Sequence, residues 1–275
     1  MRRILLAVFT VFLMLIPVTM SMGETADKKL TVLGDSIASG YGLAEYTPGN
    51  NYSAPLSFGN MLGAEFESYR NFAVDGRTSR QLLDALTAPS GTLANAVCDA
   101  DVIVVSIGGN DFLQPMISAV KKAAMGDYEL IAAIFKGEFR AEMLGDYSQR
   151  ILTSALDAAK LVDVEKTAEN IRKCVKIISD ANPNARIILM TVYDPFSGNV
   201  LLKAASDVAK ERLSILNTEI MAMENGNVSV TDVYSAFDGR AGELTNINKL
   251  DIHPNAEGHN RIYELLREKI GTAGF

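Results

Sequence analysis

Five short stretches along the chain have the pattern of β-strands. Four of them contain several β-branched residues, and the remaining one, 68–72, is more polar and ends in a phenylalanine. In chain order these stretches are 29–33, 68–72, 101–107, 186–190 and 227–233. The clearest, 101–107, shows no alternation of apolar and polar positions, which is typical of strands in a sheet covered on both faces.

Amphipathic helical patterns separate these stretches. Apolar residues spaced three or four apart predict helices around 164–178 and 202–223. Further helices are expected at 53–66, with Pro55 in its first turn, and from Thr78, where Thr-x-x-Gln is a capping-box pattern. Asn255 is a candidate cap for a final helix. Strands that alternate with helices predict an α/β fold, a three-layer α/β/α sandwich with a five-stranded parallel sheet.

One connection is longer than this pattern requires. About 75 residues separate Asp111 from Arg186, where a single crossover helix would suffice. Three apolar groups in this stretch have helical spacing: Ile117/Val120, Leu130/Ile131/Ile134/Phe135 and Ile151/Leu152/Ala155/Leu156. They predict a helical insertion after the third strand, at about 112–162. Its apolar faces either pack on the core or form a lid or acyl-chain wall beside a site.

The amino-terminal residues have the pattern of an export signal. Met1-Arg2-Arg3 is followed by an apolar run at 4–20 and small residues suited to cleavage after Ser21 or Gly23. We interpret 1–23 as a signal peptide and 28–275 as one folded domain, which predicts a secreted or extracytoplasmic protein. The alternative is a membrane anchor at 4–20 that stays attached and keeps the protein near a membrane.

Composition narrows the function classes. An apolar fraction of 48% and a charged fraction of 21% are those of a globular protein, and the formal net charge is −7. Since no basic patch stands out, nucleic acid is not an expected partner. The chain has two cysteines, Cys98 and Cys174. Cys174 adjoins a helical apolar stripe, which favours a buried thiol, and a single Cys98–Cys174 disulfide stays open.

Candidate chemistry begins just after the first strand, where the chain turns through Gly34-Asp35-Ser36. A serine at the carboxyl end of a strand can act as a nucleophile if a base lies within hydrogen-bond reach. The chain has only two histidines, His253 and His259. His253 is the candidate base, because a neutral imidazole with the reference pKa of about 6.5 suits that role. His259 falls on the apolar face of the final helix and is expected to be structural.

Four blocks in this order resemble the SGNH hydrolases, the GDSL lipase/esterase superfamily. They are Gly34-Asp35-Ser36, Asn71-Phe72-Ala73-Val74-Asp75-Gly76, Gly108-Gly109-Asn110-Asp111 and His253-Pro254-Asn255. The resemblance implies a flavodoxin-like sheet, Ser36 as nucleophile and His253 as base. It also implies an oxyanion hole formed by the backbone N–H groups of Ser36 and Gly76 and by the side-chain amide of Asn110.

The third member of the triad departs from the family pattern. That pattern is Asp-x-x-His, and the position three residues before His253 is Leu250. Asp251 is one residue closer to the histidine. Either Asp251 reaches the ring from a differently shaped loop, or a backbone carbonyl orients the imidazole.

These observations predict a serine esterase or acylhydrolase that forms an acyl-enzyme on Ser36. Its carboxylic ester could be a lipid, a short-chain acyl ester or an acetylated carbohydrate, and no metal or organic cofactor is expected. Neither nucleotide-binding glycine motifs nor a Gly-x-Ser-x-Gly elbow occur. The alternative is an exported binding module that keeps the fold and has lost turnover. The oligomeric state is left open.

Overall fold

The computed structural model describes residues 25, 27–88, 91–123, 132–133, 136, 140 and 148–272. The predicted signal peptide or anchor at 1–23 lies outside this part, so cleavage and export stay predictions. Within the described part, no helix combines the length and apolarity needed to cross a membrane.

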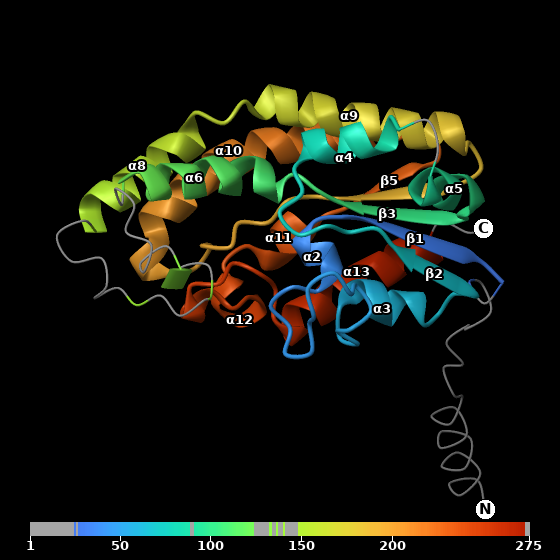
Figure 1. Ribbon diagram of the computed structural model, residues 1–275, viewed down its shortest axis with the longest axis horizontal. Helices are drawn as coiled ribbons and strands as arrows, with labels where there is room; N and C mark the ends of the chain where they lie inside the picture. The colour runs from blue at the N-terminus through green and yellow to red at the C-terminus, as the bar shows by residue number, and fades with distance from the viewer. Residues whose placement is uncertain are drawn as a thin grey trace, which may run out of the picture.

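A five-stranded sheet forms the centre of the fold (Figure 1). Its strands are β1 (Lys29–Gly34), β2 (Ser68–Asn71), β3 (Val102–Ser106), β4 (Arg186–Met190) and β5 (Val228–Thr231). Their spatial order is β2-β1-β3-β4-β5, and every neighbouring pair is parallel. All five predicted strands are therefore present, and the predicted α/β fold with its parallel sheet is confirmed.

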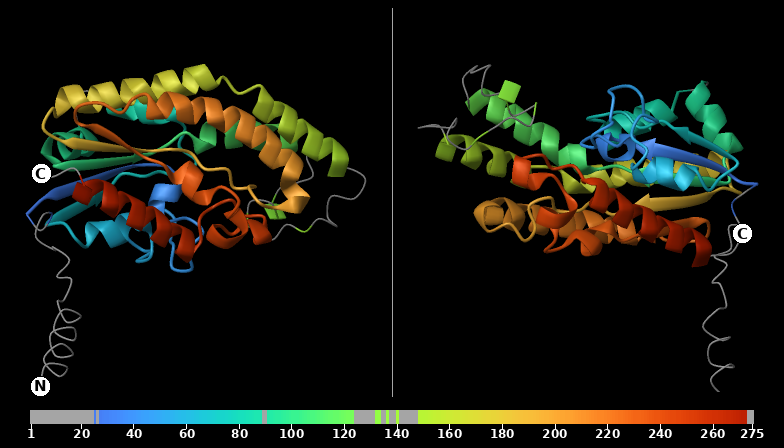
Figure 2. Two further views of the ribbon diagram at one scale, coloured as in Figure 1. Left: turned by 180° about the vertical axis from the view of Figure 1, so that it is seen from behind. Right: turned by 90° about the horizontal axis from the view of Figure 1, so that it is seen from below.

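Helices cover both faces of the sheet, as the views in Figure 2 show. The helices are α2 (Ser36–Ser39), α3 (Phe58–Gly63), α4 (Ser79–Leu86), α5 (Thr92–Asp99), α6 (Gly109–Ala123), α8 (Ser148–Lys160), α9 (Val164–Ala181), α10 (Lys203–Met221), α11 (Val233–Phe237), α12 (Ala241–Leu244) and α13 (Ala256–Thr272), with 3-10 turns η2 (Val200–Leu202) and η3 (Ile247–Lys249). Helices α4, α5, α9 and α10 pack on one face, and α3, α11, α12 and α13 pack on the other.

The alternation of side chains along each strand produces two cores. In β3, Ile103 and Val105 join the cluster under α9 and α10, whereas Val102 and Val104 join the cluster under α3 and α13. All four side chains are fully buried. Both faces of the sheet are thus apolar, which explains the uninterrupted apolar run in the sequence.

Side-chain caps fix where several helices begin. Thr78 and Gln81 form the predicted capping box of α4, and the Asn255 side chain accepts a hydrogen bond from the N–H of Gly258 in α13. The expected helix at 53–66 is wrong in its extent, since α3 begins only at Phe58. The Ser57 side chain caps α3 there, and hydrogen-bonded turns occupy the chain before it.

The predicted insertion is described only at its two ends. Helix α6 starts directly after β3 and packs along α8, and these helices form the end of the molecule away from α5 (Figure 1). The middle apolar group (Leu130, Ile131, Ile134 and Phe135) lies outside the described residues, so the insertion as a whole stays a prediction.

The two cysteines are unpaired. Cys174 is buried in the core under α9, as the apolar stripe predicted, and Cys98 is exposed. The open possibility of a Cys98–Cys174 disulfide is therefore wrong, because α9 points the Cys174 thiol into the core.

Gly258 marks a close approach between α13 and the end of α12. A Cβ atom added there would lie 2.0 Å from the carbonyl oxygen of Leu244. We expect Gly258→Ala to lower the free energy of unfolding by about 1–3 kcal/mol, since the backbone must shift to relieve the overlap. Gly271→Ala, in the same helix with open space around it, is the matched control and should be neutral or slightly stabilising. Urea unfolding of both variants measures the difference, and equal stabilities would contradict the prediction.

Candidate active site

The candidate residues gather at the carboxyl edge of the sheet. Ser36 follows β1, Gly76 follows β2, and Asn110 lies in the first turn of α6 after β3. Because the chain crosses from one side of β1 to the other between β2 and β3, the β1–β3 boundary is the topological switch point of the sheet. Ligands of open α/β sheets bind at such a point.

Ser36, His253 and Asp251 form a continuous hydrogen-bonded chain. The Ser36 Oγ lies 2.9 Å from His253 Nε2, and His253 Nδ1 lies 2.5 Å from Asp251 Oδ1. A carboxylate only accepts, so Nδ1 carries the hydrogen and Nε2 accepts from the Ser36 hydroxyl. Burial opposes ionisation of Asp251, but its hydrogen bond from His253 and the charge of that residue outweigh it and hold the Asp251 pKa below its usual value.

The loop before α13 has the shape that brings Asp251 to the ring. Leu250 has φ = 60°, the one left-handed non-glycine residue in the described part of the chain. Its N–H donates to Ile247, which closes η3, and the N–H of Asp251 donates to the carbonyl of Asn246. This sharp turn places the carboxylate two residues before His253 beside Nδ1, although the family spacing would place it at 250.

Side chains from α2 and α6 hold the loop that carries Gly76, whose N–H is a candidate oxyanion donor. The Ser39 hydroxyl lies 2.6 Å from an Asp75 carboxylate oxygen and 2.9 Å from the Ser36 carbonyl oxygen, and its one hydrogen is shared between them. This contact joins α2 to the residue just before Gly76. Gly76 has φ = 74°, and the Gln114 side chain of α6 donates to its carbonyl. Within the described residues, the N–H groups of Ser36 and Gly76 donate to no protein acceptor, which leaves both available to a ligand oxygen.

Asn110 is held by a buried carboxyl group. Its side-chain nitrogen lies 3.3 Å from Asp35 Oδ2, and the residue is 5% exposed. Asp35 also accepts from the N–H of Ile37 at the start of α2. Burial raises the pKa of Asp35 to about 7, although both of these donors favour its charged form. One hydrogen of the Asn110 amide is thereby oriented by Asp35, and the other stays free for a ligand.

Asn110→Ala removes this side-chain donor. We expect kcat for a nitrophenyl ester to fall by about 10²- to 10³-fold, the usual loss for one oxyanion donor. KM and the melting temperature, measured beside kcat, show whether the loss lies in the chemical step. Turnover within a fewfold of wild type would remove Asn110 from the site.

His259 lies apart from this constellation, as expected from its position in the sequence. It is completely buried, and its Nδ1 accepts from the N–H of Phe58 at 3.3 Å. Its Nε2 has no partner among the described residues. Burial lowers the pKa of His259 to about 3, because a charged imidazole would lose its hydration there. His259 therefore packs α13 against α3.

This depressed pKa predicts a pH-dependent stability. Below pH 6.5, the ordinary pKa of a histidine, His259 is protonated in the unfolded chain. In the folded protein it stays neutral down to about pH 3. As pH falls from about 6 to 4, wild type should lose about 1.4 kcal/mol per pH unit relative to His259→Asn, which keeps an acceptor for Phe58. Urea unfolding at pH 4, 5 and 6 measures this difference. A constant difference would contradict the prediction.

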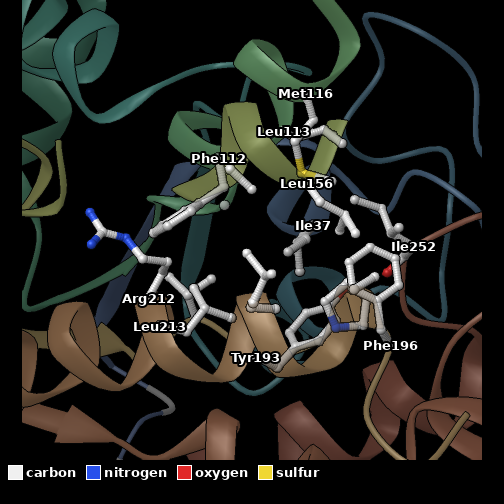
Figure 3. A pocket seen from close by; sticks show the side chains of 17 residues that line it. Ile37, Phe112, Leu113, Met116, Leu156, Tyr193, Phe196, Arg212, Leu213 and Ile252 are labelled. Carbon is white, nitrogen blue, oxygen red and sulfur yellow. The ribbon is translucent and has the colours of Figure 1, made fainter. Parts of the chain in front are cut away.

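An apolar cavity of about 80 Å³ lies beside the triad (Figure 3). Its walls come from α6, α8, α10 and the segment after β4. Its lining residues are Ile37, Gly109, Phe112, Leu113, Met116, Leu156, Ala159, Val192, Tyr193, Pro195, Phe196, Ala205, Val208, Ala209, Arg212, Leu213 and Ile252. Ile37, Gly109 and Ile252 are the direct chain neighbours of Ser36, Asn110 and the Asp251/His253 pair.

Two aromatic residues at the site were not predicted from the sequence. The Tyr41 ring packs against the His253 ring with centroids 4.4 Å apart, and the buried Tyr193 hydroxyl donates to the Ile252 carbonyl at 2.7 Å. Both limit the movement of the loop that carries His253. Only their positions in the sequence could have pointed to them, since Tyr41 follows the Ser36 turn and Tyr193 follows β4.

In the part of the chain that the structure describes, no group of three or more His, Cys, Asp or Glu side chains is placed to hold a metal ion.

Comparisons with known proteins identify the family and the fold. The sequence profile of the GDSL-like lipase/acylhydrolase family matches residues 32–261. No curated protein matches the chain in sequence.

Solved structures resemble the fold across most of the chain. Phospholipase A1 from Streptomyces albidoflavus NA297 is 19% identical with a TM-score of 0.61, covering 89% of this chain and 100% of its own. The lipase Lip_vut3 from a goat rumen metagenome is 20% identical with a TM-score of 0.55 (88% and 96%). Axe2, an acetylxylan esterase from Geobacillus stearothermophilus, is 16% identical with a TM-score of 0.53 (90% and 96%). At sequence identities this low, the similarity shows that the fold is shared and carries no conclusion about activity.

Proposed function

Because the chain belongs to the GDSL-like lipase/acylhydrolase family, we propose that this ester-hydrolysing enzyme works by a serine mechanism at Ser36. The observation that carries the proposal is the chain of contacts from Ser36 Oγ through His253 to Asp251. A serine hydroxyl is a weak nucleophile alone, and such an arrangement is what activates it.

The reaction follows from these atoms. Ser36 Oγ attacks the ester carbonyl carbon as its proton passes to His253 Nε2, and Asp251 stabilises the imidazolium. The carbonyl oxygen becomes an oxyanion that accepts from the N–H groups of Ser36 and Gly76 and from Asn110. His253 then protonates the leaving alcohol, which leaves an acyl-enzyme. Water attacks this ester by the same steps in reverse and releases the carboxylic acid and the Ser36 hydroxyl.

A binding module with a silent site is the alternative, and specific contacts favour the enzyme. A binding site needs neither a histidine with its tautomer fixed by a carboxylate nor backbone N–H groups kept free beside a hydroxyl. Ser36 is 8% exposed, so its hydroxyl is shielded from bulk water and still lies next to a cavity. These features together support turnover.

Covalent labelling tests the proposal directly. A fluorophosphonate should modify Ser36 in the folded protein with one equivalent, located by peptide mass spectrometry, and Ser36→Ala should stay unlabelled. Reaction of the reagent depends on an activated hydroxyl, so labelling should slow strongly in His253→Ala. A folded wild-type protein that stays unlabelled would favour the binding module.

Export is a separate part of the proposal and rests on residues 1–23. If 1–23 is a cleaved signal peptide, the exported protein should begin at residue 22 or 24, as the two candidate cleavage points require. The mass of the intact protein recovered from outside the cytoplasm measures this. An uncut chain in the membrane fraction would instead favour the anchor.

A further inference from the structure

The cavity beside the triad has no role in the proton transfers above. We propose that it binds the acyl chain of the substrate, and that the protein prefers esters of unbranched medium-length acyl chains to acetyl esters. This inference rests on the proposed function and names its substrate class.

The cavity lies on the correct side of the reacting atoms. Ile37 and Gly109, which line it, are the neighbours of the oxyanion donors Ser36 and Asn110. An acyl carbonyl held by those donors would therefore have its chain directed between these two residues.

The walls suit a hydrocarbon chain. Apart from Arg212, the lining side chains carry no charge, and Phe112, Leu156 and Leu213 face one another across the space (Figure 3). The Arg212 guanidinium points away from the cavity and donates to the carbonyl of Val162. Arg212 thus presents its aliphatic stem to the cavity, as long basic side chains do at apolar surfaces.

The dimensions indicate a chain of medium length. Lining residues on α10 extend from Ala205 to Leu213, a rise of about 12 Å, which corresponds to roughly eight to ten carbon atoms of an extended chain. One water needs about 10–15 Å³ of such space, so 80 Å³ holds a row of several methylene groups. An acetyl group would leave most of this cavity empty.

The surroundings of His253 assign the alcohol to the other side. His253 Nε2 must reach the leaving oxygen, and the Tyr41 ring packs against the imidazole there. Tyr46 lies next to Tyr41 and donates to Asp75. Polar hydroxyl and carboxylate groups therefore surround the leaving alcohol, whereas the acyl side is apolar.

Two substrate series test the assignment. In nitrophenyl esters from acetate to laurate, kcat/KM of wild type should rise by about fourfold per added methylene until the cavity is full, near eight to ten carbons. In alkyl acetates, lengthening the alcohol should change kcat/KM by less than about threefold in total, because the alcohol chain does not enter the apolar cavity and buries little apolar surface. A preference for acetate, or equal dependence on both chains, would overturn the inference.

A cavity-filling variant and a matched control complete the test. Ala209→Phe places a ring in the cavity from α10, and the ratio of octanoate to acetate kcat/KM should fall by about tenfold or more. Ala204→Phe, on the same helix with an exposed side chain outside the lining, should keep the wild-type ratio. Leu156→Trp fills the cavity from α8 if Ala209→Phe does not fold.

The two proposals fail in different ways. If folded Ala209→Phe and Leu156→Trp both keep the wild-type ratio while hydrolysis still requires Ser36, the acyl-chain inference is wrong and the serine mechanism stands. If no ester in either series is hydrolysed in a Ser36-dependent way, the proposed function itself is wrong.

Discussion

Ser36→Ala should lower kcat for a nitrophenyl ester by about 10⁴- to 10⁶-fold, the scale of loss when the nucleophile of a serine triad is removed. No other described hydroxyl is hydrogen-bonded to His253, so no acyl-enzyme should form. Steady-state and burst kinetics of purified protein measure both effects, and the burst of nitrophenol should vanish in the variant.

Ser39→Ala is the matched control for this experiment. Ser39 lies one turn further in the same short helix and is likewise buried, but it contacts Asp75 and not His253. Its loss should reduce activity by a much smaller factor, because it only steadies the loop of Gly76. Comparable losses in both variants would show that the effect of Ser36→Ala comes from damage to α2.

Asp251→Asn should produce the second-largest loss, about 10⁴-fold in kcat, with a small change in KM. An amide can donate a hydrogen bond to His253 Nδ1, which forces the hydrogen onto Nε2. The ring then cannot accept the Ser36 proton, although its position is kept. The rate of fluorophosphonate labelling should fall with kcat, and this second readout distinguishes a tautomer effect from altered substrate binding.

Position 250 offers the control for Asp251. In the double variant Leu250→Asp with Asp251→Asn, the carboxylate occupies the position of the family pattern. It should not restore activity, since Leu250 is 39% exposed and its left-handed backbone precedes the turn that aims residue 251 at the ring. Recovery of activity would mean that the loop can take the family conformation. A loss below tenfold in Asp251→Asn alone would indicate that a backbone carbonyl orients His253.

Much of the fold was predictable because its determinants are local. The segments 102–105 and 187–190 are apolar throughout, so buried strands were predicted there. The Thr78–Gln81 spacing fixed a helix start in the same way. The start of α3 was missed because the turns before it depend on backbone hydrogen bonds from Ser53 to Asn50 and from Ser57 to Ala54, which helical periodicity does not reveal.

The candidate site also has a part that the sequence predicted and a part that it did not. The order of the four sequence blocks predicted that Ser36 and His253 would lie together, as they do at 2.9 Å. The left-handed Leu250 and the Tyr41–His253 contact could not be predicted. Each depends on how a loop closes against elements distant in the sequence, and residue type alone does not determine that geometry.

Ser36 and His253 lie far apart in the sequence, and four of the five strands of the sheet come between them. During synthesis, the serine emerges more than two hundred residues before the histidine that activates it, since 217 positions separate them. Under the proposed mechanism, the Ser36 hydroxyl is therefore not activated until folding brings His253 beside it. The esterase activity that we propose would then begin only after the segment that carries His253 has docked, late in folding.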